Sequence, residues 1–445
     1  MKRLLLIPAL VLLVLLSLGA RKWKYAETPA EKARRMRWWQ EARFGMFIHW
    51  GTYSLSGRSE WVKYYEKIPE EEYTKYFRHF YPDLYDPARW ARLAREAGMR
   101  YAVITAKHHE GFCLWDSKYT DYKATNTPYG RDLLRPFVKA FREAGLRVGF
   151  YYSLLDWHHP QYTLDKYHPL FRNPNQAREE NRHRNMKAYV EYMKNQLREL
   201  LTQFGRVDLL FLDFSFPGKN GKGRQDWHST ELLSLIRSLQ PWIIINDRLD
   251  LLDFPGGWDY RTPEQVMPRG WVKHGGHRVP WETCQTITGY WGYMRDSNGW
   301  KSTRQLITML IEAVSKGGNL LLNVGPTGRG AFPEKTVRRL KGIGRWMRYH
   351  SRSIYGCTQP PDEFKKPDNC LLTYNPQTRR LYIHVLSWPS IGRLHLEGYG
   401  GKVEYAQLLH DASEVKFTEE KGDVILHLPI RKPAVAVPVI EVFLK

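Results

Sequence analysis

The chain contains a series of short apolar runs of strand length, each of which ends in polar or reactive residues. Residues 207–212 are the clearest of these runs, and their near-continuous hydrophobicity suits a strand buried on both faces of a parallel sheet. Asp213 follows directly, and Pro217 and Gly218 break the strand. Barrels and open α/β sheets carry their chemistry at the C-terminal ends of strands. Asp213 is therefore a candidate functional residue, with the cap of a following helix or a turn as the alternative.

Strands and helices alternate through most of the chain. The expected strands lie at residues 44–49, 101–106, 147–152, 207–212, 242–248 and 319–324. The expected helices lie at about residues 28–40, 86–98, 176–203, 229–239 and 303–315, with another that ends at Gly145. The segment Arg-Glu-Ala-Gly at residues 95–98 recurs at residues 142–145, and in both copies the glycine ends a helix before a strand. This rhythm predicts a parallel (β/α) TIM-like barrel.

The C-terminal part of the chain has a different pattern. Beyond Gly356, short strands such as residues 381–386 and 424–428 occur without helices. Short strands without intervening helices predict a C-terminal β-sandwich domain, here over residues 356–445. The catalytic (β/α) barrel domain is then expected over residues 21–355.

The N-terminus has the pattern of a secretory signal peptide. A Lys-Arg pair precedes an apolar run at residues 4–18, and small residues follow before Arg21. We therefore expect residues 1–20 to be removed and the mature protein to be secreted, periplasmic or held in the cell envelope. An uncleaved anchor is the alternative, and the protein is expected at a membrane only if this segment is retained.

The composition adds charge and aromatic side chains to this picture. The formal net charge is +22, but the basic residues are spread through the expected helices, which argues against a nucleic-acid partner and predicts a solvated cationic surface. The 27 Tyr and 17 Trp residues suit sugar recognition, although core packing explains most aromatic residues in most proteins. Four cysteines are too few for a disulfide scaffold; we expect Cys113 and Cys284 to be free, and Cys357 and Cys370 either to pair or to stay free. A homo-oligomer is left open.

Polar and aromatic residues near the strand ends are expected to surround the mouth of such a barrel. They are His49, Glu60, Trp61, His108, His109, Tyr152, Asp213, Arg248 and Glu264. A metal site is one interpretation of the two adjacent histidines, but neighbouring strand residues point to opposite faces and no metal-ligand spacing is present, so we expect no metal. The other interpretation is hydrolysis by two carboxylates, one attacking or stabilising and one protonating the leaving oxygen.

Motifs spread over residues 30–355 together resemble the α-L-fucosidases of glycoside hydrolase family 29. They are FGMFIHWG at residues 44–51, Glu60-Trp61, KHHEGF at residues 107–112, WDS at residues 115–117, Trp157 after Asp156, Asp213, WETC at residues 281–284 and GNLLLNVGP at residues 318–326. Each motif is weak alone, but their number and order make the resemblance specific. It implies a (β/α) barrel with a C-terminal β-sandwich, and exo-acting hydrolysis of terminal α-L-fucosyl residues from a fucosylated glycan. Retention of configuration and the absence of a metal or other cofactor are also implied.

The resemblance also implies roles for individual residues. Asp213 matches the family nucleophile, and Trp291 matches an aromatic residue near the methyl group of the sugar. The positions that hold the fucose ring are matched by His49, Glu60, Trp61, His108, His109, Tyr152 and Arg248. Glu264, in a Thr-Pro-Glu loop, is the first choice for the acid/base residue, and Glu282 is the alternative.

Two positions depart from the family pattern. Phe211 stands where the family often has Trp, and residues 214–219 replace a glycine-rich run. Both departures affect the shape of the leaving-group side and not the mechanism. Other functions stay open from the sequence: an exo-glycosidase for another galactose-configured sugar, a catalytically silent sugar-binding relative, or a surface protein whose charge drives adhesion.

Overall fold

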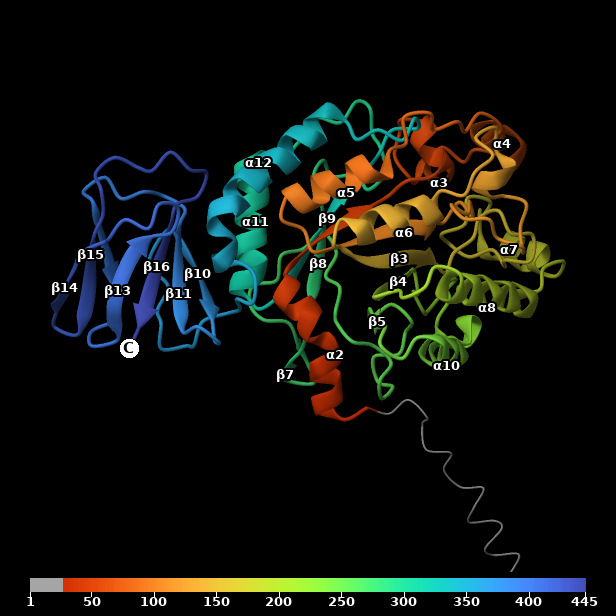
Figure 1. Ribbon diagram of the computed structural model, residues 1–445. Helices are drawn as coiled ribbons and strands as arrows, with labels where there is room; N and C mark the ends of the chain where they lie inside the picture. The colour runs from red at the N-terminus through yellow and green to blue at the C-terminus, as the bar shows by residue number, and fades with distance from the viewer. Residues whose placement is uncertain (1–26) are drawn as a thin grey trace, which may run out of the picture.

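The computed structural model describes residues 27–445, so the predicted signal peptide lies outside the described residues. A barrel of parallel strands surrounded by helices forms the larger part of the molecule, and a pair of antiparallel sheets forms the smaller part (Figure 1). The predicted fold class, a (β/α) TIM-like barrel with a C-terminal β-sandwich, is confirmed.

Seven parallel strands make up the barrel sheet, in the order β5-β4-β3-β2-β1-β9-β8. They are β1 (Phe44–Ile48), β2 (Tyr101–Lys107), β3 (Arg147–Ser153), β4 (Leu209–Asp213), β5 (Ile244–Ile245), β8 (Glu282–Thr286) and β9 (Asn319–Val324). Of the residues in these strands, only Arg147 is not buried. Strands covered on both faces explain why the sequence shows continuous apolar runs rather than alternation.

An irregular segment, residues 260–264, takes the place of an eighth strand between β5 and β8. Isolated parallel bridges join Asn246 to Tyr260, Arg261 to Trp281 and Glu264 to Cys284. Beside this segment, the side-chain amide of Asn246 exchanges hydrogen bonds of 2.8 and 3.1 Å with the backbone of Leu212 and so extends the pairing of the short β5. The barrel is closed in this way, and Glu264 is carried to its C-terminal mouth.

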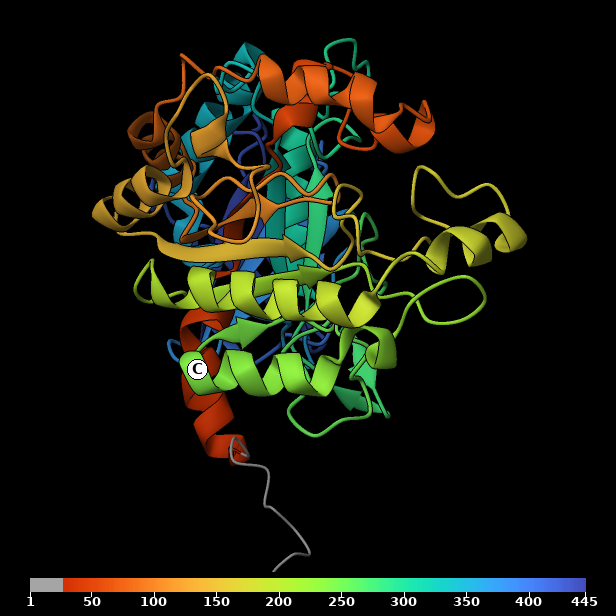
Figure 2. The same ribbon diagram turned by 90° about the vertical axis from the view of Figure 1, so that its right-hand side faces the viewer.

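The helices pack around the barrel and connect its strands. They are α2 (Pro29–Ala42), α3 (Val62–Tyr65), α4 (Glu70–Arg78), α5 (Pro87–Glu96), α6 (Leu134–Glu143), α7 (Pro174–Asn181), α8 (Met186–Thr202), α9 (Arg224–Trp227), α10 (Ser229–Leu239), α11 (Thr303–Ser315) and α12 (Glu334–His350), with short 3-10 turns η1 (Thr52–Leu55), η2 (Ala124–Asn126) and η3 (Ser351–Ser353). Figure 2 shows α8 and α10 side by side against the barrel.

The prediction of one helix over residues 176–203 is wrong. The chain breaks between α7 and α8 because Asn185 starts a new helix: its side-chain oxygen accepts hydrogen bonds from the backbone N–H groups of Lys187 and Ala188, at 3.1 and 3.3 Å. A side chain that satisfies the free N–H groups of a first helical turn favours a helix start at that point.

Helix α2 closes the end of the barrel opposite the mouth. Met36 and Trp39 on α2 join the apolar cluster inside the barrel, and the side-chain amide of Asn319, at the start of β9, donates to the Trp39 carbonyl at 2.8 Å. The interior is therefore a packed core below the mouth and not a channel.

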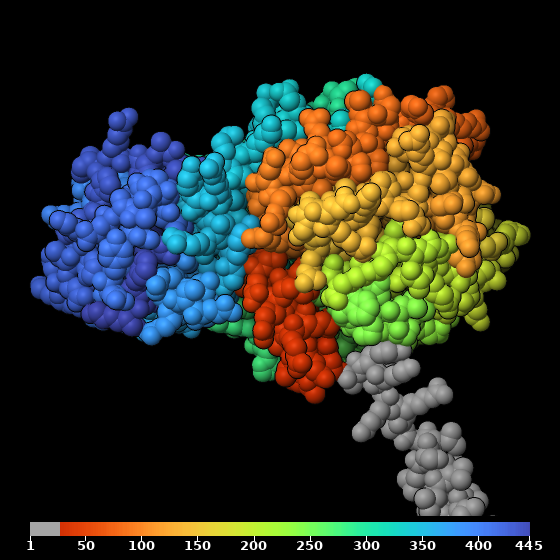
Figure 3. Space-filling view, in the orientation of Figure 1, coloured from red at the N-terminus to blue at the C-terminus, as the bar shows by residue number. Residues whose placement is uncertain are grey.

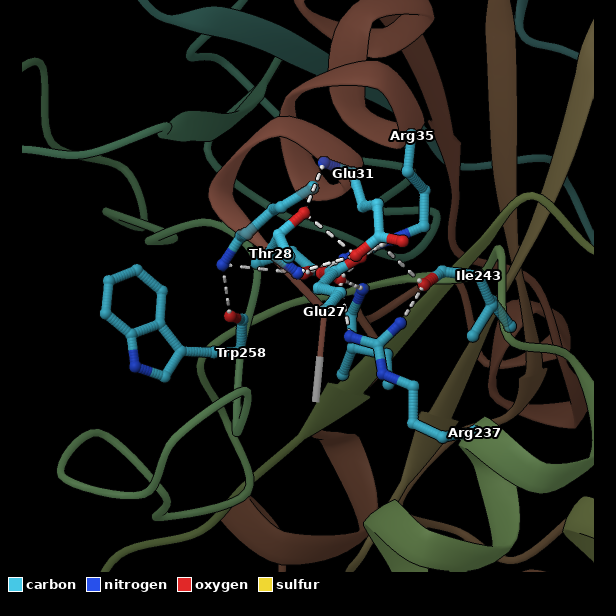
Figure 4. Close-up of polar contacts among 10 residues, drawn as sticks. Glu27, Thr28, Glu31, Arg35, Arg237, Ile243 and Trp258 are labelled. Atoms are coloured by element: carbon cyan, nitrogen blue, oxygen red, sulfur yellow. Dashed lines mark hydrogen bonds and ion pairs between the residues drawn. The ribbon is translucent and has the colours of Figure 1, made fainter. Parts of the chain in front are cut away.

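A charge cluster around the buried Asp259 fastens α2 and α10 to this closed end. Figure 4 shows Arg35, Arg237 and Ile243 of this cluster. Arg35 of α2 donates to both carboxylate oxygens of Asp259, at 2.7 and 3.0 Å, and Arg237 of α10 donates to Oδ2 at 2.8 Å. Both arginines also reach the carbonyl oxygen of Ile243, the residue before β5. Asp259 directly precedes the segment 260–264, so this cluster anchors the lower end of the segment that carries Glu264.

Two antiparallel sheets form the C-terminal part, which is the predicted β-sandwich. One sheet is β10 (Cys370–Asn375), β11 (Arg380–Val385), β16 (Val439–Leu444) and β13 (Val403–Leu408), and the other is β12 (Arg393–Leu396), β15 (Asp423–His427) and β14 (Phe417–Glu420); β6 (Lys273–His274) and β7 (His277–Arg278) form a separate ribbon on the barrel. The sandwich has its own apolar core. Helices α11 and α12 lie between it and the barrel (Figures 1 and 3), and the Trp346 indole donates to the carbonyl of Val437 across this junction at 2.8 Å.

All four cysteines are buried and free, including Cys357 and Cys370, so the structure does not contain the disulfide that the sequence left open. Across residues 27–445, no helix combines the length and hydropathy that a membrane crossing needs.

Candidate active site

A pocket of about 140 Å³ opens at the C-terminal mouth of the barrel. It is lined by Phe47, His49, Trp61, His108, His109, Tyr151, Phe211, Asp213, Phe214, Phe216, Arg248, Glu264, Cys284 and Trp291. The structure thus brings together eight of the residues predicted from the sequence, which come from five different strands or the segments that follow them. Aromatic walls with a few convergent polar groups are typical of a small-molecule site.

Asp213, the last residue of β4, lies in this pocket and is 8% exposed. Its Oδ2 accepts a hydrogen bond from the Tyr151 hydroxyl and its Oδ1 one from Arg248 Nη1, both at 2.7 Å. Burial raises the pKa of Asp213, but the charge of Arg248 and these two hydrogen bonds outweigh burial and hold the pKa below its ordinary value. The carboxyl group is therefore ionised at neutral pH.

The backbone turns sharply after Asp213. Phe214 has a φ of 79°, a left-handed conformation that a bulky side chain adopts only when its surroundings impose it. The turn leaves Asp213 in the barrel interior and sends Phe214 and Phe216 to the pocket rim.

Arg248 links Asp213 to the second carboxylate, Glu264. Nη1 of Arg248 lies 2.7 Å from Asp213 Oδ1 and 2.8 Å from Glu264 Oε2. These two oxygens are therefore no more than 5.5 Å apart. Two carboxyl groups separated by about 5–5.5 Å are the arrangement of retaining glycosidases, whereas inverting enzymes need roughly 6.5–9.5 Å to admit a water. The Glu264 side chain is 42% exposed, which places it at the rim.

Two histidines of the pocket are held neutral, each with a defined tautomer. Burial lowers the pKa of His49 to about 3 and that of His109 to about 4. The Ser153 hydroxyl donates its only proton to the Leu155 carbonyl at 2.8 Å, so His109 Nδ1 must donate to Ser153 Oγ, 2.6 Å away. His109 Nε2 is consequently an acceptor.

The same argument fixes the tautomer of His49. The amide nitrogen of Asn323 donates to the Trp291 carbonyl at 2.7 Å, which leaves Asn323 Oδ1 to accept from His49 Nδ1, also at 2.7 Å. His49 Nε2 is then an acceptor too. Neutral imidazoles that present lone pairs suit the hydroxyl groups of a sugar, which are hydrogen-bond donors.

His108 and His109 both line the pocket, with ring centroids 4.1 Å apart. The expectation that these neighbours point to opposite faces is wrong. Strand β2 ends at Lys107, after a register shift between Thr105 and Lys107, so the two histidines lie in the following turn and strand alternation does not apply to them.

Tyr152 does not line the pocket, contrary to the prediction. Its hydroxyl donates to the side-chain oxygen of Gln196 on α8 at 2.8 Å, in the core outside the barrel. Tyr151, one residue earlier, faces the interior and donates to Asp213. Successive side chains of a strand point to opposite faces, so a displacement of one residue moves the side chain across the sheet.

The other predicted sugar-binding residues belong to the segments that follow β1 and β8. Trp61 and Trp291 line the pocket. Glu60 is buried, does not line the pocket, and accepts a hydrogen bond from the Gly292 N–H at 2.6 Å, which holds the segment that carries Trp291.

A comparison with known sequences decides the family. The family profile described as alpha-L-fucosidase matches residues 14–352 of this chain. The chain belongs to the α-L-fucosidase family. The resemblance predicted from the sequence motifs is therefore confirmed, and with it the enzyme class, a glycoside hydrolase.

Individual relatives agree with this assignment to the fucosidase family. Human plasma alpha-L-fucosidase is 30% identical over 427 residues, which is 88% of this chain and 85% of the human protein. Among solved structures, alpha-L-fucosidase isoenzyme 1 from Paenibacillus thiaminolyticus is 41% identical with a TM-score of 0.87, covering 93% of this chain and 99% of that one. An alpha-L-fucosidase from Bacteroides thetaiotaomicron, solved as a trapped covalent intermediate with 2-fluoro-fucosyl fluoride, is 29% identical with a TM-score of 0.81, covering 96% of this chain and all of that one.

Glu282, the alternative acid/base residue of this fucosidase-family chain, lies away from the pocket. It is fully buried at the first position of β8, at the closed end of the barrel, where it accepts a hydrogen bond from the Tyr101 hydroxyl. Burial raises the pKa of Glu282 to about 8, so the side chain is a neutral carboxylic acid near pH 7. Glu282 therefore cannot contact a sugar in the pocket directly.

Within residues 27–445, no group of three or more His, Cys, Asp or Glu side chains is arranged to hold a metal ion. The pocket also contains residues that were not among the predicted site residues, chiefly Tyr151, Phe47, Phe214 and Phe216, although Phe47 belongs to the motif at residues 44–51. Alternation along β1, β3 and β4 is the signal that points Phe47 and Tyr151 inward with Asp213, whereas no sequence pattern places Phe214 or Phe216.

Proposed function

We propose that this protein hydrolyses terminal α-L-fucosyl residues of glycans by double displacement, with Asp213 as nucleophile and Glu264 as acid/base. The observation that carries the proposal is the shared contact of both carboxylates with Arg248 Nη1, because it sets their oxygens within 5.5 Å of each other. That spacing leaves no room for an inverting water between sugar and carboxylate.

In the first step, Asp213 attacks the anomeric carbon while the bond to the leaving-group oxygen breaks, and Glu264 donates its proton to that oxygen. In the second step, the Glu264 carboxylate takes a proton from a water molecule, which attacks the anomeric carbon and releases Asp213. The second step requires Glu264 as an ionised carboxylate. The ion pair between Glu264 and Arg248 is formed by that ionised carboxylate. A nucleophile must be ionised at the working pH, and the lowered pKa of Asp213 meets that condition.

The shape of the pocket supports removal of a terminal residue. Its inner end is closed by the packed barrel interior, so a sugar enters with one end only and a continuous glycan chain does not pass through. His49 Nε2 and His109 Nε2 accept hydrogen bonds from the sugar hydroxyls, and Trp291 packs against the apolar methyl side of a fucosyl ring.

Purified protein assayed on aryl α-L-fucoside and aryl β-galactoside tests this proposal. We expect hydrolysis of the fucoside with a large preference over the galactoside. Preference for the galactoside would favour an exo-glycosidase for another galactose-configured sugar, and sugar binding without turnover would favour a catalytically silent relative.

The N-terminal sequence pattern supports export through a cleaved signal peptide, which we include in the proposal. The plasma fucosidase relatives are consistent with a function outside the cell. N-terminal sequencing of the exported protein should begin near residue 21, and an intact Met1 in a membrane fraction would instead indicate an anchor.

A further inference from the structure

A continuous group of aromatic rings extends from the pocket to the protein surface. Trp61 and Phe214 are in contact at the pocket wall, with ring centroids 5.4 Å apart. Phe214 contacts Phe216 at 4.7 Å and Tyr167 at 4.6 Å, and Trp61 contacts Tyr65 at 6.0 Å. We call these five residues the rim aromatics.

Two of the rim aromatics are open to solvent. Phe216 is 43% exposed and Tyr65 is 70% exposed, whereas Asp213, deep in the pocket, is 8% exposed. Large aromatic side chains gathered at the edge of a binding pocket are a common feature of ligand-binding surfaces, because covering them removes apolar area from water. Their exposure therefore points to an occupant outside the pocket proper.

The loops that carry these rings are held rigidly together. The N–H of Phe216 donates to the Lys222 carbonyl at 2.9 Å, and the buried Lys222 ammonium group donates to Asp165 and to the Thr163 carbonyl, both at 2.6 Å. A buried ion pair costs free energy unless its geometry is good. The Lys222–Asp165 pair is well formed, and it holds the loop of Phe216 against the loop of Tyr167. These contacts position Phe216 next to Tyr167 before a ligand binds.

We infer that Phe216 and Tyr65 bind the leaving group of the substrate, and that they favour a leaving group that is itself a pyranose sugar. This inference rests on the proposed function. With a fucosyl ring in the closed pocket and its anomeric carbon toward Asp213, the leaving group has to project toward the open rim, where Glu264 stands. One face of a pyranose ring presents several C–H groups, and such a face packs against the electron-rich face of an aromatic ring.

The test compares two substrates that differ only in the leaving group. α-L-Fucosyl fluoride has no group that reaches the rim, whereas a fucosyl-N-acetylglucosamine disaccharide places a pyranose there. The measured quantity is the ratio of kcat/KM for the disaccharide to kcat/KM for the fluoride. We expect this ratio to fall about 3- to 10-fold in Phe216→Ala and in Tyr65→Ala, the size expected for loss of one aromatic contact, and to be largely restored in Phe216→Tyr.

Tyr349→Ala on α12 is the matched control, because Tyr349 is 50% exposed and lies on a different helix from the rim aromatics; its ratio should equal that of the wild type. An unchanged ratio in both rim variants would overturn the inference. This includes an equal loss on both substrates, since that result places the residues in fucose binding or folding. A wild-type protein inactive on fucosyl fluoride would overturn the proposed function itself.

Discussion

The hydroxyl of Tyr151 donates a 2.7 Å hydrogen bond to Asp213 across the β3–β4 pair, while Tyr152 points out of the barrel toward Gln196. One oxygen of Asp213 is thereby bonded to Tyr151 and the other to Arg248. Both contacts stabilise the carboxylate over the carboxylic acid, and both orient it toward the pocket.

Tyr151→Phe should lower kcat/KM by about 10- to 100-fold, because a hydrogen bond to a charged group contributes roughly 1.5–3 kcal/mol. The variant should also move the acidic limb of the pH profile of kcat/KM to higher pH. The hydrogen bond from Tyr151 lowers the pKa of Asp213, so its loss raises that pKa, and Asp213 becomes protonated at a higher pH than in the wild type.

Tyr152→Phe is the matched control, since it removes the same atom from the neighbouring residue. Its pH profile should coincide with that of the wild type. A shifted acidic limb in Tyr152→Phe, with none in Tyr151→Phe, would show that the assignment to Tyr151 is wrong.

Glu264→Ala should be nearly inactive on a fucosyl disaccharide, with a loss of about 10²- to 10⁴-fold, because a poor leaving group needs a proton. On an activated aryl fucoside, azide should restore turnover and give α-fucosyl azide, since azide needs no general base and attacks the β-linked fucosyl ester of Asp213 from the face that water uses. Glu282→Ala should show no such rescue, because Glu282 lies at the closed end of the barrel. Azide rescue of Glu282→Ala alone would transfer the proton-donor role to Glu282.

The buried acid Glu282 should make the stability of the fold depend on pH. Its folded pKa, raised by burial to about 8, lies above the unfolded value of about 4.3, so the folded state binds the extra proton between these values. The contribution is fully present below pH about 4.3 and is lost as the pH rises through 8, by at most about 1.4 kcal/mol per pH unit.

Glu282→Gln carries no titrating group at this position and isolates that effect. The difference in thermal midpoint between pH 5 and pH 8 should be smaller in Glu282→Gln than in the wild type, whatever constant loss of stability the substitution causes. Equal differences in the two proteins would mean that Glu282 does not hold a proton in the folded state.

Asp259→Asn should destabilise the protein by roughly 3–5 kcal/mol, because it removes the shared counter-charge of Arg35 and Arg237 and leaves the buried Arg237 without its ion-pair partner. The measurement is the free energy of unfolding or the thermal midpoint. Asp253→Asn is the control: Asp253 is exposed, pairs with Arg224 at the surface, and should leave the midpoint unchanged. Similar midpoints for both variants would remove Asp259 as an anchor of α2 and α10.

Much of the architecture could be predicted from the sequence, because parallel strands buried on both faces leave continuous apolar runs. The runs ending at Asp213 and at Val324 correspond to β4 and β9. The hydrophobic pattern does not mark the break at Asn185, because residues 178–185 are all polar and contain no Gly or Pro. The two-residue length of β5 was missed because Asn246 substitutes a side-chain amide for backbone pairing, which no hydrophobic pattern records.

The candidate site was predictable where motif and strand position agree, as for Asp213, His49 and Arg248. The motif resemblance predicts Tyr152 as a site residue, whereas alternation along β3, in step with Asp213 on β4, favours Tyr151. Phe216 depends on loop contacts made by Lys222, far from any motif, and only the three-dimensional structure places it at the rim.

The most direct test of the account is to identify the residue that becomes covalently bound to the sugar. The Glu264→Gln variant is incubated with 2-fluoro-fucosyl fluoride, digested, and analysed by mass spectrometry of its peptides. The account predicts one fluorofucosyl group per chain, on the peptide that contains Asp213 and attached to that residue, and no label in an Asp213→Ala, Glu264→Gln double variant. A label on any other carboxylate would contradict it.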